Sequence, residues 1–258
     1  MTEVLIAGAG LTGLACAFHL LEMGLTAEKV KLVDARQELG SPNRSSGLLL
    51  DTTRCSHLLG CLDGQLQLQD LGDNRSGLRR EWLEKSIGIH LTKAGATIDL
   101  KRRIDDCEST PKGVRLSINQ GKEAIEILGG IGILVDALGS KPRSSGFPGD
   151  CNIIRSTAVH AVRSPHLQDI REWLGTLIPS EDEHIDISPI HTSFLRGDGL
   201  REEWTREPSP DLLHSNDWTE IMVSRHPPKI DEFSVDVIIQ RGTALAEAVL
   251  SNPLLSKT

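Results

Sequence analysis

Short apolar runs alternate with glycine-containing turns at the start of the chain. An apolar run at residues 4–7 enters a glycine-rich turn, and a mostly apolar stretch of helical periodicity follows at residues 14–23. Gly24 ends this stretch, and a second apolar run occupies residues 30–33. Short continuous apolar runs are typical of buried strands, so the pattern predicts a strand, a helix and a second strand in that order.

Apolar side chains recur every fourth residue in the segment 78–93, at Leu83, Ile87 and Leu91. That spacing places them on one face of a helix. A strand is expected directly after this helix, at residues 96–100.

Other segments show the alternation that is typical of strands. It occurs at residues 64–69, behind a short helix expected near residues 56–62. Residues 114–119 and 124–128 alternate on either side of a Gln-Gly-Lys turn, which predicts a β-hairpin. The continuous apolar run at residues 131–135 predicts a further buried strand.

The second half of the chain has fewer regular patterns. Leucine and isoleucine at helical spacing predict an amphipathic helix over residues 167–177. A second helix is expected at residues 235–250.

The turn after the first apolar run reads Gly-x-Gly-x-x-Gly. Its glycines are Gly8, Gly10 and Gly13, and an acid, Asp34, follows 21 residues after the last of them. In this motif the first glycine allows a tight turn, the second lets the backbone approach a pyrophosphate, and the third lets the helix pack closely on the strand. The helix N-terminus offers N–H groups to the phosphates, and the acid accepts hydrogen bonds from the ribose. These features predict a dinucleotide site.

Composition excludes several classes of function. A formal charge of −8 and a pI of about 5.6 argue against a general nucleic-acid binder. No apolar run reaches the roughly 18 residues of a membrane span, and no basic segment precedes the first apolar run as in a signal peptide. Five cysteines without a C-x-x-C pair suit a reducing compartment, so a cytoplasmic location is expected.

Three later motifs indicate which dinucleotide is bound. The first is a helix start, Arg80-Glu81-Trp82-Leu83-Glu84, followed by the strand start Gly95-Ala96-Thr97-Ile98. The second is the end of a predicted strand, Asp136-Ala137-Leu138-Gly139. The third is a polar loop, Arg44-Ser45-Ser46-Gly47-Leu48. With the glycine turn, these motifs resemble the flavoprotein superfamily that includes p-hydroxybenzoate hydroxylase and the geranylgeranyl reductases. The resemblance covers roughly residues 3–150.

The resemblance implies an α/β fold. We expect a Rossmann-type, three-layer ββα FAD/NAD(P)-binding domain with a β-meander at residues 1–150, and a small substrate or cap region at residues 151–234. The C-terminal helix, within residues 235–258, is expected to pack on the first domain. The residues expected to contact FAD are Gly8, Gly10, Leu11, Thr12, Gly13, Asp34, Ala35, Arg36, Gly47, Arg80, Asp136, Gly139 and Asp198.

The implied activity is that of an FAD-dependent oxidoreductase, in which a hydride passes through the flavin. Similarity to the geranylgeranyl reductases implies reduction of double bonds in an isoprenoid or other lipid, with NAD(P)H or ferredoxin as electron donor. A lipid substrate would also imply peripheral association with a membrane. The sequence identifies no catalytic acid or base.

The chain departs from the family patterns at three positions. Ser45 stands where the reductase loop usually has cysteine, and Leu138 stands where hydroxylases have an acid. Asp198, in Gly197-Asp198-Gly199, is the only candidate for the family's Gly-Asp-Ala motif.

Three alternatives remain open at this point. Thiamine thiazole synthases share the N-terminal unit, an NAD(P)-dependent dehydrogenase shares the glycine turn, and a non-catalytic FAD-binding subunit would explain the short second region. A metal site is not expected, because the segment Cys55–Cys61 has no second Cys/His pair of matching spacing.

Overall fold

The computed structural model describes most of the chain, namely residues 4–41, 45–110, 113–119, 125–138, 161–163, 169–179, 185–207 and 219–252. The chain divides into two compact units. The first unit comprises residues 1–41, 87–166 and 241–258, and the second comprises residues 42–86 and 167–240. Each unit is drawn from separate segments, whereas the ranges expected from the sequence are contiguous.

A five-stranded parallel sheet forms the centre of the first unit. Its order is β11 (Ala161–Arg163), β10 (Ile133–Asp136), β1 (Val4–Ala7), β2 (Val30–Val33) and β6 (Thr97–Asp99). The first strand is central, and later strands add on both sides of it, which is the order of a Rossmann-type sheet. The predicted strands at residues 4–7 and 30–33 are confirmed.

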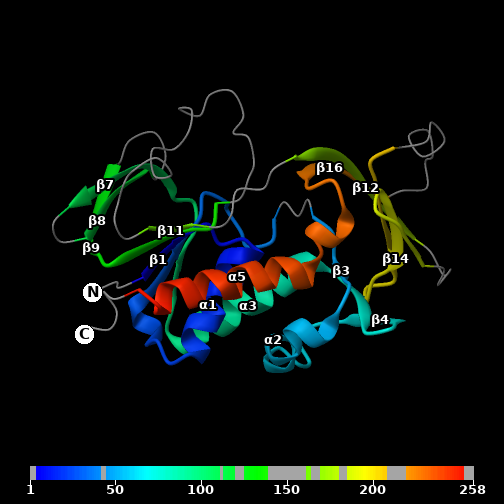
Figure 1. Ribbon diagram of the computed structural model, residues 1–258, viewed down its shortest axis with the longest axis horizontal. Helices are drawn as coiled ribbons and strands as arrows, with labels where there is room; N and C mark the ends of the chain where they lie inside the picture. Colours follow the sequence, from blue (N-terminus) through cyan, green and yellow to red (C-terminus); the bar gives the residue numbers. More distant parts are fainter. Residues whose placement is uncertain are drawn as a thin grey trace. The chain divides into compact units, whose positions relative to one another are not determined.

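A β-meander covers one face of this sheet, as Figure 1 shows. It consists of β7 (Arg103–Thr110), β8 (Gly113–Asn119) and β9 (Ile125–Ile131), which confirms the predicted hairpin strands. The apolar core between the two layers contains Leu5, Ala7, Val33 and Leu134 from the sheet and Ile104, Ile118 and Ile131 from the meander. The segments in which apolar and polar residues alternate, β8 and β9, therefore belong to the second β-layer.

Helices form the third layer of this unit. α1 (Leu11–Glu22) lies there with the C-terminal parts of α3 (Arg80–Ala94) and α5 (Val235–Leu250) (Figure 1). A methyl group on Gly242 of α5 would lie 2.5 Å from the carbonyl oxygen of Thr12, so the two helices pack closely. The predicted three-layer ββα architecture is confirmed.

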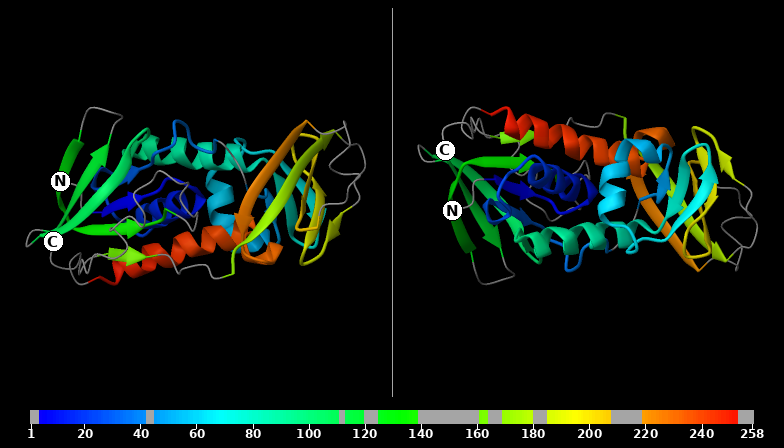
Figure 2. Two further views of the ribbon diagram at one scale, coloured as in Figure 1. Left: turned by 90° about the horizontal axis from the view of Figure 1, so that it is seen from above. Right: turned by 90° about the horizontal axis from the view of Figure 1, so that it is seen from below.

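The second unit contains an antiparallel five-stranded sheet. Its order is β13 (Asp186–Ile187), β14 (His191–Leu195), β15 (Leu200–Thr205), β12 (Arg171–Pro179) and β16 (Glu220–His226). Figure 2 shows β12 and β16 running side by side. A small sheet of β3 (Leu48–Leu49), β5 (Arg75–Leu78) and β4 (Leu68–Gly72) belongs to the same unit.

The remaining elements are short. α2 (Ser56–Cys61) confirms the predicted helix near residues 56–62. Three 3₁₀ turns complete the described structure, η1 (Ala27–Lys29), η2 (Thr52–Cys55) and η3 (Ile230–Glu232).

The prediction of a helix at residues 167–177 is wrong, because residues 171–179 form strand β12. Trp173, Gly175 and Leu177 are buried at strand spacing, and β12 is hydrogen-bonded on both sides, to β15 and β16. The helical spacing of leucines is therefore accidental, and pairing with distant strands decides the conformation. The strand predicted at residues 64–69 begins later, at Leu68, because the preceding residues form a turn.

Aromatic side chains fill the core of the second unit. Trp173 and Trp204 are fully buried on neighbouring strands. The ring of Phe233 lies 5.0 Å from that of Trp173 and stacks at 4.3 Å on the ring of His226. Burial of these rings is a major stabilising contribution to the unit.

Candidate functional site

The glycine turn joins β1 to α1 in a conformation that only glycine fits at two positions. Gly8 has φ of +101°, and a methyl group there would lie 2.5 Å from the carbonyl oxygen of Ala137. A methyl group on Gly13 would lie 1.9 Å from the carbonyl oxygen of Gly8. The first and third glycines therefore serve the tight turn and the helix–strand contact that the motif predicts.

Gly10 differs from these two glycines. Its φ of −72° and ψ of 176° suit any residue, and the nearest atom to an added methyl group is Nη2 of Arg36, at 3.8 Å. The backbone of Gly10 is thus not crowded by the protein, and no side chain caps the helix that begins at Leu11. The N–H groups of the first helical turn have no partner within the helix, so they can bind an anion.

Asp34 lies at the end of β2, beside the same turn. Its carboxylate is largely buried, and its Oδ2 accepts a hydrogen bond from the backbone N–H of Ala9 at 2.7 Å. The guanidinium of Arg36 donates through Nε to Oδ1 and through Nη2 to Oδ2, at 3.1 Å each, and the Arg36 backbone N–H donates to Oδ1 at 2.8 Å. The predicted acid and the glycine turn are therefore directly connected.

The end of β10 forms another side of the turn. Asp136 is in register with Ala7 of β1, and the N–H of Ala137 donates to the carbonyl of Ala7 at 2.8 Å. The carboxylate of Asp136 accepts from the N–H of Leu138 at 3.2 Å. The structure thus places Asp136 next to the glycine turn, and its contact with FAD remains a prediction, whereas Gly139 lies outside the described residues.

Comparison with known protein families identifies this part of the chain. Residues 3–128 match the family model described as "FAD dependent oxidoreductase". Residues 3–128 belong to the FAD-dependent oxidoreductases. The glycine turn and Asp34 lie within the FAD-dependent oxidoreductase domain, which implies that the domain binds FAD.

Solved structures show the same fold over nearly the whole chain. A flavoprotein/dehydrogenase from Cytophaga hutchinsonii is 14% identical, with a TM-score of 0.69, and the match covers 99% of this chain and 79% of that one. A geranylgeranyl bacteriochlorophyll reductase-like protein from Thermoplasma acidophilum is 14% identical, with a TM-score of 0.67, covering 99% and 81%. The p-nitrophenol 4-monooxygenase PnpA from Pseudomonas putida is 11% identical, with a TM-score of 0.68, covering 100% and 81%.

At these identities the likeness concerns the fold alone. A search of curated proteins finds no sequence match to this chain. The solved structures of this fold are described as proteins of different activities, namely a flavoprotein/dehydrogenase, a reductase-like protein and a monooxygenase.

Three of the residues expected to contact FAD belong to the second unit. Arg80, in the first turn of α3, is buried, and its Nε donates to Glu84 at 3.2 Å, so it takes part in a buried ion pair within the helix. Gly47 lies in the loop before β3, and its N–H donates to Oε1 of Glu202 at 2.8 Å. Contact of either residue with FAD remains a prediction.

Asp198 lies in the turn between β14 and β15, and its two carboxylate oxygens accept hydrogen bonds from Nε and Nη2 of Arg196. Burial by itself would raise the pKa of Asp198, but Arg196 outweighs this effect, so the pKa lies below its usual value. Strands β15 and β16 separate this turn from α5 along the chain, whereas the family motif directly precedes its helix. The structure gives Asp198 a role in the turn, and its contact with FAD remains a prediction.

Two functional candidates were not identified from the sequence. Glu202 is a fully buried carboxylate, and Arg196 is its buried ionic partner at 3.2 Å. In the sequence, Glu202 looks like part of an ordinary solvated run of charged residues, Arg201-Glu202-Glu203. The available signal is Trp204 two positions later, because residues two apart on a strand share a face.

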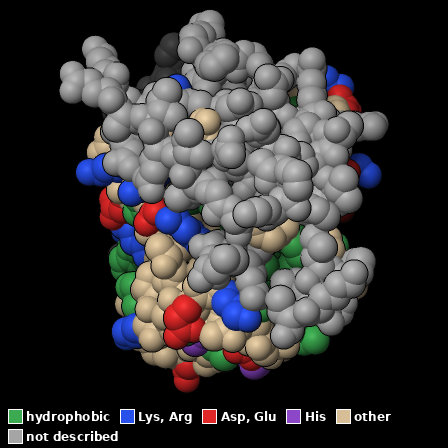
Figure 3. All heavy atoms as spheres, turned by 90° about the vertical axis from the view of Figure 1, so that its left-hand side faces the viewer, with side chains coloured by type: hydrophobic (Ala, Val, Ile, Leu, Met, Phe, Trp, Pro, Cys, Tyr) green, Lys and Arg blue, Asp and Glu red, His purple; other side chains and the backbone are tan. Residues whose placement is uncertain are grey.

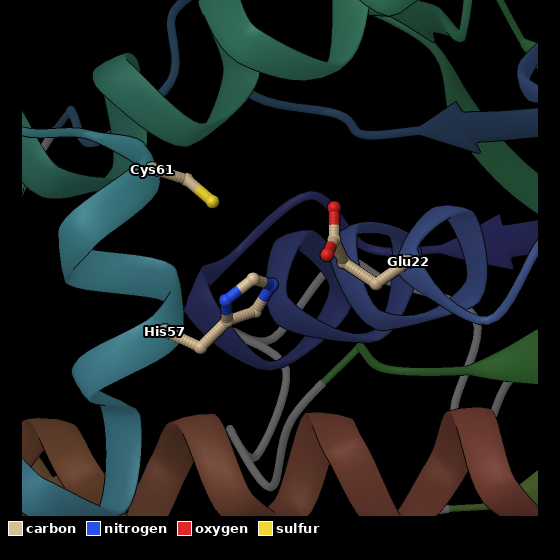
Figure 4. Close-up of side chains that lie close together, drawn as sticks. All are labelled: Glu22, His57 and Cys61. Atoms are coloured by element: carbon tan, nitrogen blue, oxygen red, sulfur yellow. The ribbon is translucent and has the colours of Figure 1, made fainter.

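The segment Cys55–Cys61 offers two ligand side chains on one side of α2. His57 and Cys61 lie about one turn apart and project from the same side of the helix (Figure 4). The thiol of Cys55 is buried, which raises its pKa to about 12, and it donates to the carbonyl of Thr52. Two ligands from one helix do not complete the four of a structural zinc site, so we propose no metal here.

The described part of the face in Figure 3 carries basic and acidic side chains beside one another. One ion pair among the described residues joins Lys31 and Asp99, at 2.8 Å. Among the described helices, none is long and apolar enough to cross a membrane.

Proposed function

We propose that the chain binds FAD at the glycine turn and transfers a hydride through the flavin to or from a small-molecule substrate. The observation that carries this proposal is the contrast among the three glycines. Gly8 and Gly13 are enclosed by protein atoms, whereas the backbone of Gly10 is open beside an uncapped helix N-terminus. This arrangement fits a pyrophosphate, which approaches the backbone closely and accepts hydrogen bonds from free N–H groups.

The residues of the turn bind and orient the cofactor. The N–H groups of Leu11, Thr12 and Gly13 would hold the pyrophosphate, and Asp34 with its neighbour Ala35 would lie beside the adenosine ribose. When FAD is bound, its isoalloxazine ring supplies the hydride chemistry. We name no catalytic acid or base.

Binding of the ribose requires a rearrangement at Asp34. A carboxylate has about four acceptor positions, and Arg36 and the N–H of Ala9 together donate four hydrogen bonds to Asp34. A ribose hydroxyl must therefore displace part of the Arg36 side chain. The displaced part of the guanidinium would turn toward the phosphate or adenine portion of FAD.

Replacing Asp34 by alanine is expected to weaken FAD binding by about tenfold to a hundredfold, because a hydrogen bond to a charged group contributes about 1.5–3 kcal/mol. The matched control is Asp99→Ala. Asp99 ends the neighbouring strand β6 and pairs with Lys31, and we expect its loss to leave FAD affinity unchanged. Titration of both variants with FAD, followed by flavin fluorescence, measures the difference. Equal affinity of Asp34→Ala and the native chain would remove the ribose assignment.

The substrate class that we favour is an unsaturated isoprenoid or other lipid, reduced with electrons from NAD(P)H or ferredoxin. The motifs at Arg80 and Asp136 support it by their resemblance to geranylgeranyl reductases, and one structure of similar fold is described as geranylgeranyl bacteriochlorophyll reductase-like. Such a substrate would bring the protein to a membrane surface within the cytoplasm.

An absorbance spectrum of the purified protein tests the proposal first. Flavin bands near 370 and 450 nm, about the usual positions for this cofactor, are expected in the protein fraction after addition of FAD and removal of the unbound cofactor. A protein that acquires no such bands contradicts the proposal, and release of an adenylated thiazole on denaturation would instead indicate a thiazole synthase.

A protein that binds FAD is then reduced anaerobically and mixed with candidate alkenes in a stopped-flow instrument. Reoxidation of the flavin by an isoprenoid alkene, but not by its saturated analogue, supports the reductase activity. Stable FAD binding without reoxidation by any alkene favours a non-catalytic FAD-binding subunit.

A further inference from the structure

The Asp34 carboxylate in the first unit takes all its hydrogen bonds from two kinds of donor. The backbone N–H of Ala9 donates to Oδ2 at 2.7 Å, and the backbone N–H of Arg36 donates to Oδ1 at 2.8 Å. The Arg36 guanidinium fills the remaining positions, through Nε to Oδ1 and through Nη2 to Oδ2, at 3.1 Å each. Half of the acceptor capacity is therefore bound by fixed backbone groups, and the other half by one flexible side chain.

The two guanidinium donors resemble the diol of a ribose. They are adjacent N–H groups on one rigid fork, and each bonds a different oxygen of the Asp34 carboxylate. The 2′-hydroxyl of an adenosine ribose and its 3′ neighbour are likewise adjacent donors, and an acid at this position accepts from the ribose. The Arg36 guanidinium thus occupies the acceptor positions that a ribose requires.

Only the side chain of Arg36 has to move for a ribose to reach Asp34. The backbone of Arg36 is anchored on both sides, by its N–H on Asp34 and by its carbonyl, which accepts from the N–H of Lys101 at 2.9 Å. The Arg36 side chain is 27% exposed, so it already borders on water. The guanidinium can therefore leave the carboxylate without any change in the turn that carries it.

The ion pair between Arg36 and Asp34 offsets part of the interaction with a ribose. Asp34 is only 8% exposed, and a carboxylate so placed is disfavoured unless it is paired and hydrogen-bonded. Two hydrogen bonds from a cation are stronger than two from neutral hydroxyls. Each ribose hydroxyl that binds Asp34 thus replaces a donor that was already there, and its net contribution to binding is reduced.

We propose that Arg36 competes with the nucleotide ribose for Asp34 and thereby limits how strongly the site distinguishes ribose from deoxyribose. The inference rests on the proposed function, because that function places the adenosine ribose at Asp34. Both residues belong to the first unit. Arg36 is a specificity-determining residue in this view, and it takes no part in the hydride transfer.

The test is Arg36→Met, with Arg102→Met as the matched control. Methionine keeps a long side chain but has no N–H donor, so two acceptor positions of Asp34 are left for the ribose. The backbone N–H of Arg102 donates to the carbonyl of Asp34 at 2.9 Å, but its side chain pairs with Asp99. The control therefore removes the same charge beside Asp34 without exposing the carboxylate.

The decisive readout is the ratio of the affinities for ADP and 2′-deoxy-ADP, measured by isothermal titration calorimetry. Any contact of Arg36 with a phosphate contributes equally to both nucleotides and cancels in this ratio. We expect the preference for ADP to rise about tenfold in Arg36→Met, because the 2′-hydroxyl then gains a charged acceptor without displacing a donor. The ratio should stay native in Arg102→Met. A native ratio in Arg36→Met overturns the inference, and a lower stability of this variant would not by itself change the ratio.

A double-mutant cycle with FAD gives an independent measurement. Replacing Asp34 by alanine should weaken FAD binding about tenfold more in the Arg36→Met background than in the native background, because the ribose there no longer competes for the carboxylate. An equal loss of affinity in both backgrounds contradicts competition between Arg36 and the ribose.

If Arg36→Met does not fold, Arg36→Lys provides the same comparison. Lysine keeps the positive charge but lacks the planar fork that bonds both oxygens of Asp34. We expect a smaller rise in the preference for ADP, and no rise overturns the inference while leaving the proposed function intact. A native protein that binds neither ADP nor FAD refutes the proposed function, and with it the role assigned to Arg36.

Discussion

Replacing Gly13 by alanine is expected to lower the free energy of unfolding of the first unit by about 3 kcal/mol or more, as for overpacking that cannot relax. The added methyl group would lie 1.9 Å from the carbonyl oxygen of Gly8 and 3.3 Å from Cγ2 of Ile6. The backbone has little freedom to move away, because the N–H of Gly8 donates to the carbonyl of Val33 at 2.8 Å. Urea denaturation without FAD measures the effect.

The control for this substitution is Gly60→Ala in α2. A methyl group at Gly60 meets no atom within 4 Å. Alanine is also favoured over glycine within helices, by about 0.5–1 kcal/mol. We expect the urea midpoint of Gly60→Ala to equal or exceed that of the native protein. A midpoint for Gly13→Ala as high as that of the control would show that helix and strand are not packed as closely as the structure indicates.

The FAD-dependent oxidoreductase domain could be predicted largely from local sequence. The runs at residues 4–7 and 30–33 are apolar throughout, because both faces of a parallel sheet are covered, and the glycines between them mark one specific turn. Each of these signals lies within about 35 residues of the others, in keeping with a local β-α-β unit of 30 or more residues. Its strand ends, helix and acid were consequently placed correctly.

The second unit could not be predicted in this way, because its decisive contacts are distant in sequence. β12 becomes a strand through pairing with β15 and β16, although its leucines have helical spacing. Glu202 is buried by the Gly47 loop and by Trp204, so its local sequence of charged residues is misleading. A carboxylate within such a run is ordinarily solvated, and only the three-dimensional arrangement identifies its partners.

Replacing Gly10 by alanine is expected to weaken FAD binding without lowering the stability of the protein. Its backbone conformation suits alanine, and the added methyl group would lie 3.8 Å from its nearest neighbour, Nη2 of Arg36. The unfolding midpoint without FAD should therefore equal that of the native protein. The methyl group would nevertheless occupy the space through which a pyrophosphate approaches the backbone.

We expect Gly10→Ala to bind FAD about tenfold to a hundredfold more weakly, which corresponds to a steric penalty of about 1–3 kcal/mol. Fluorescence titration with FAD and urea denaturation of the same preparation give the two quantities. Gly60→Ala again serves as the control and should bind FAD with native affinity. If Gly10→Ala binds FAD as tightly as the control, the pyrophosphate does not lie over Gly10. Weakened binding with native stability would place the pyrophosphate at this turn, because the protein itself leaves that space open.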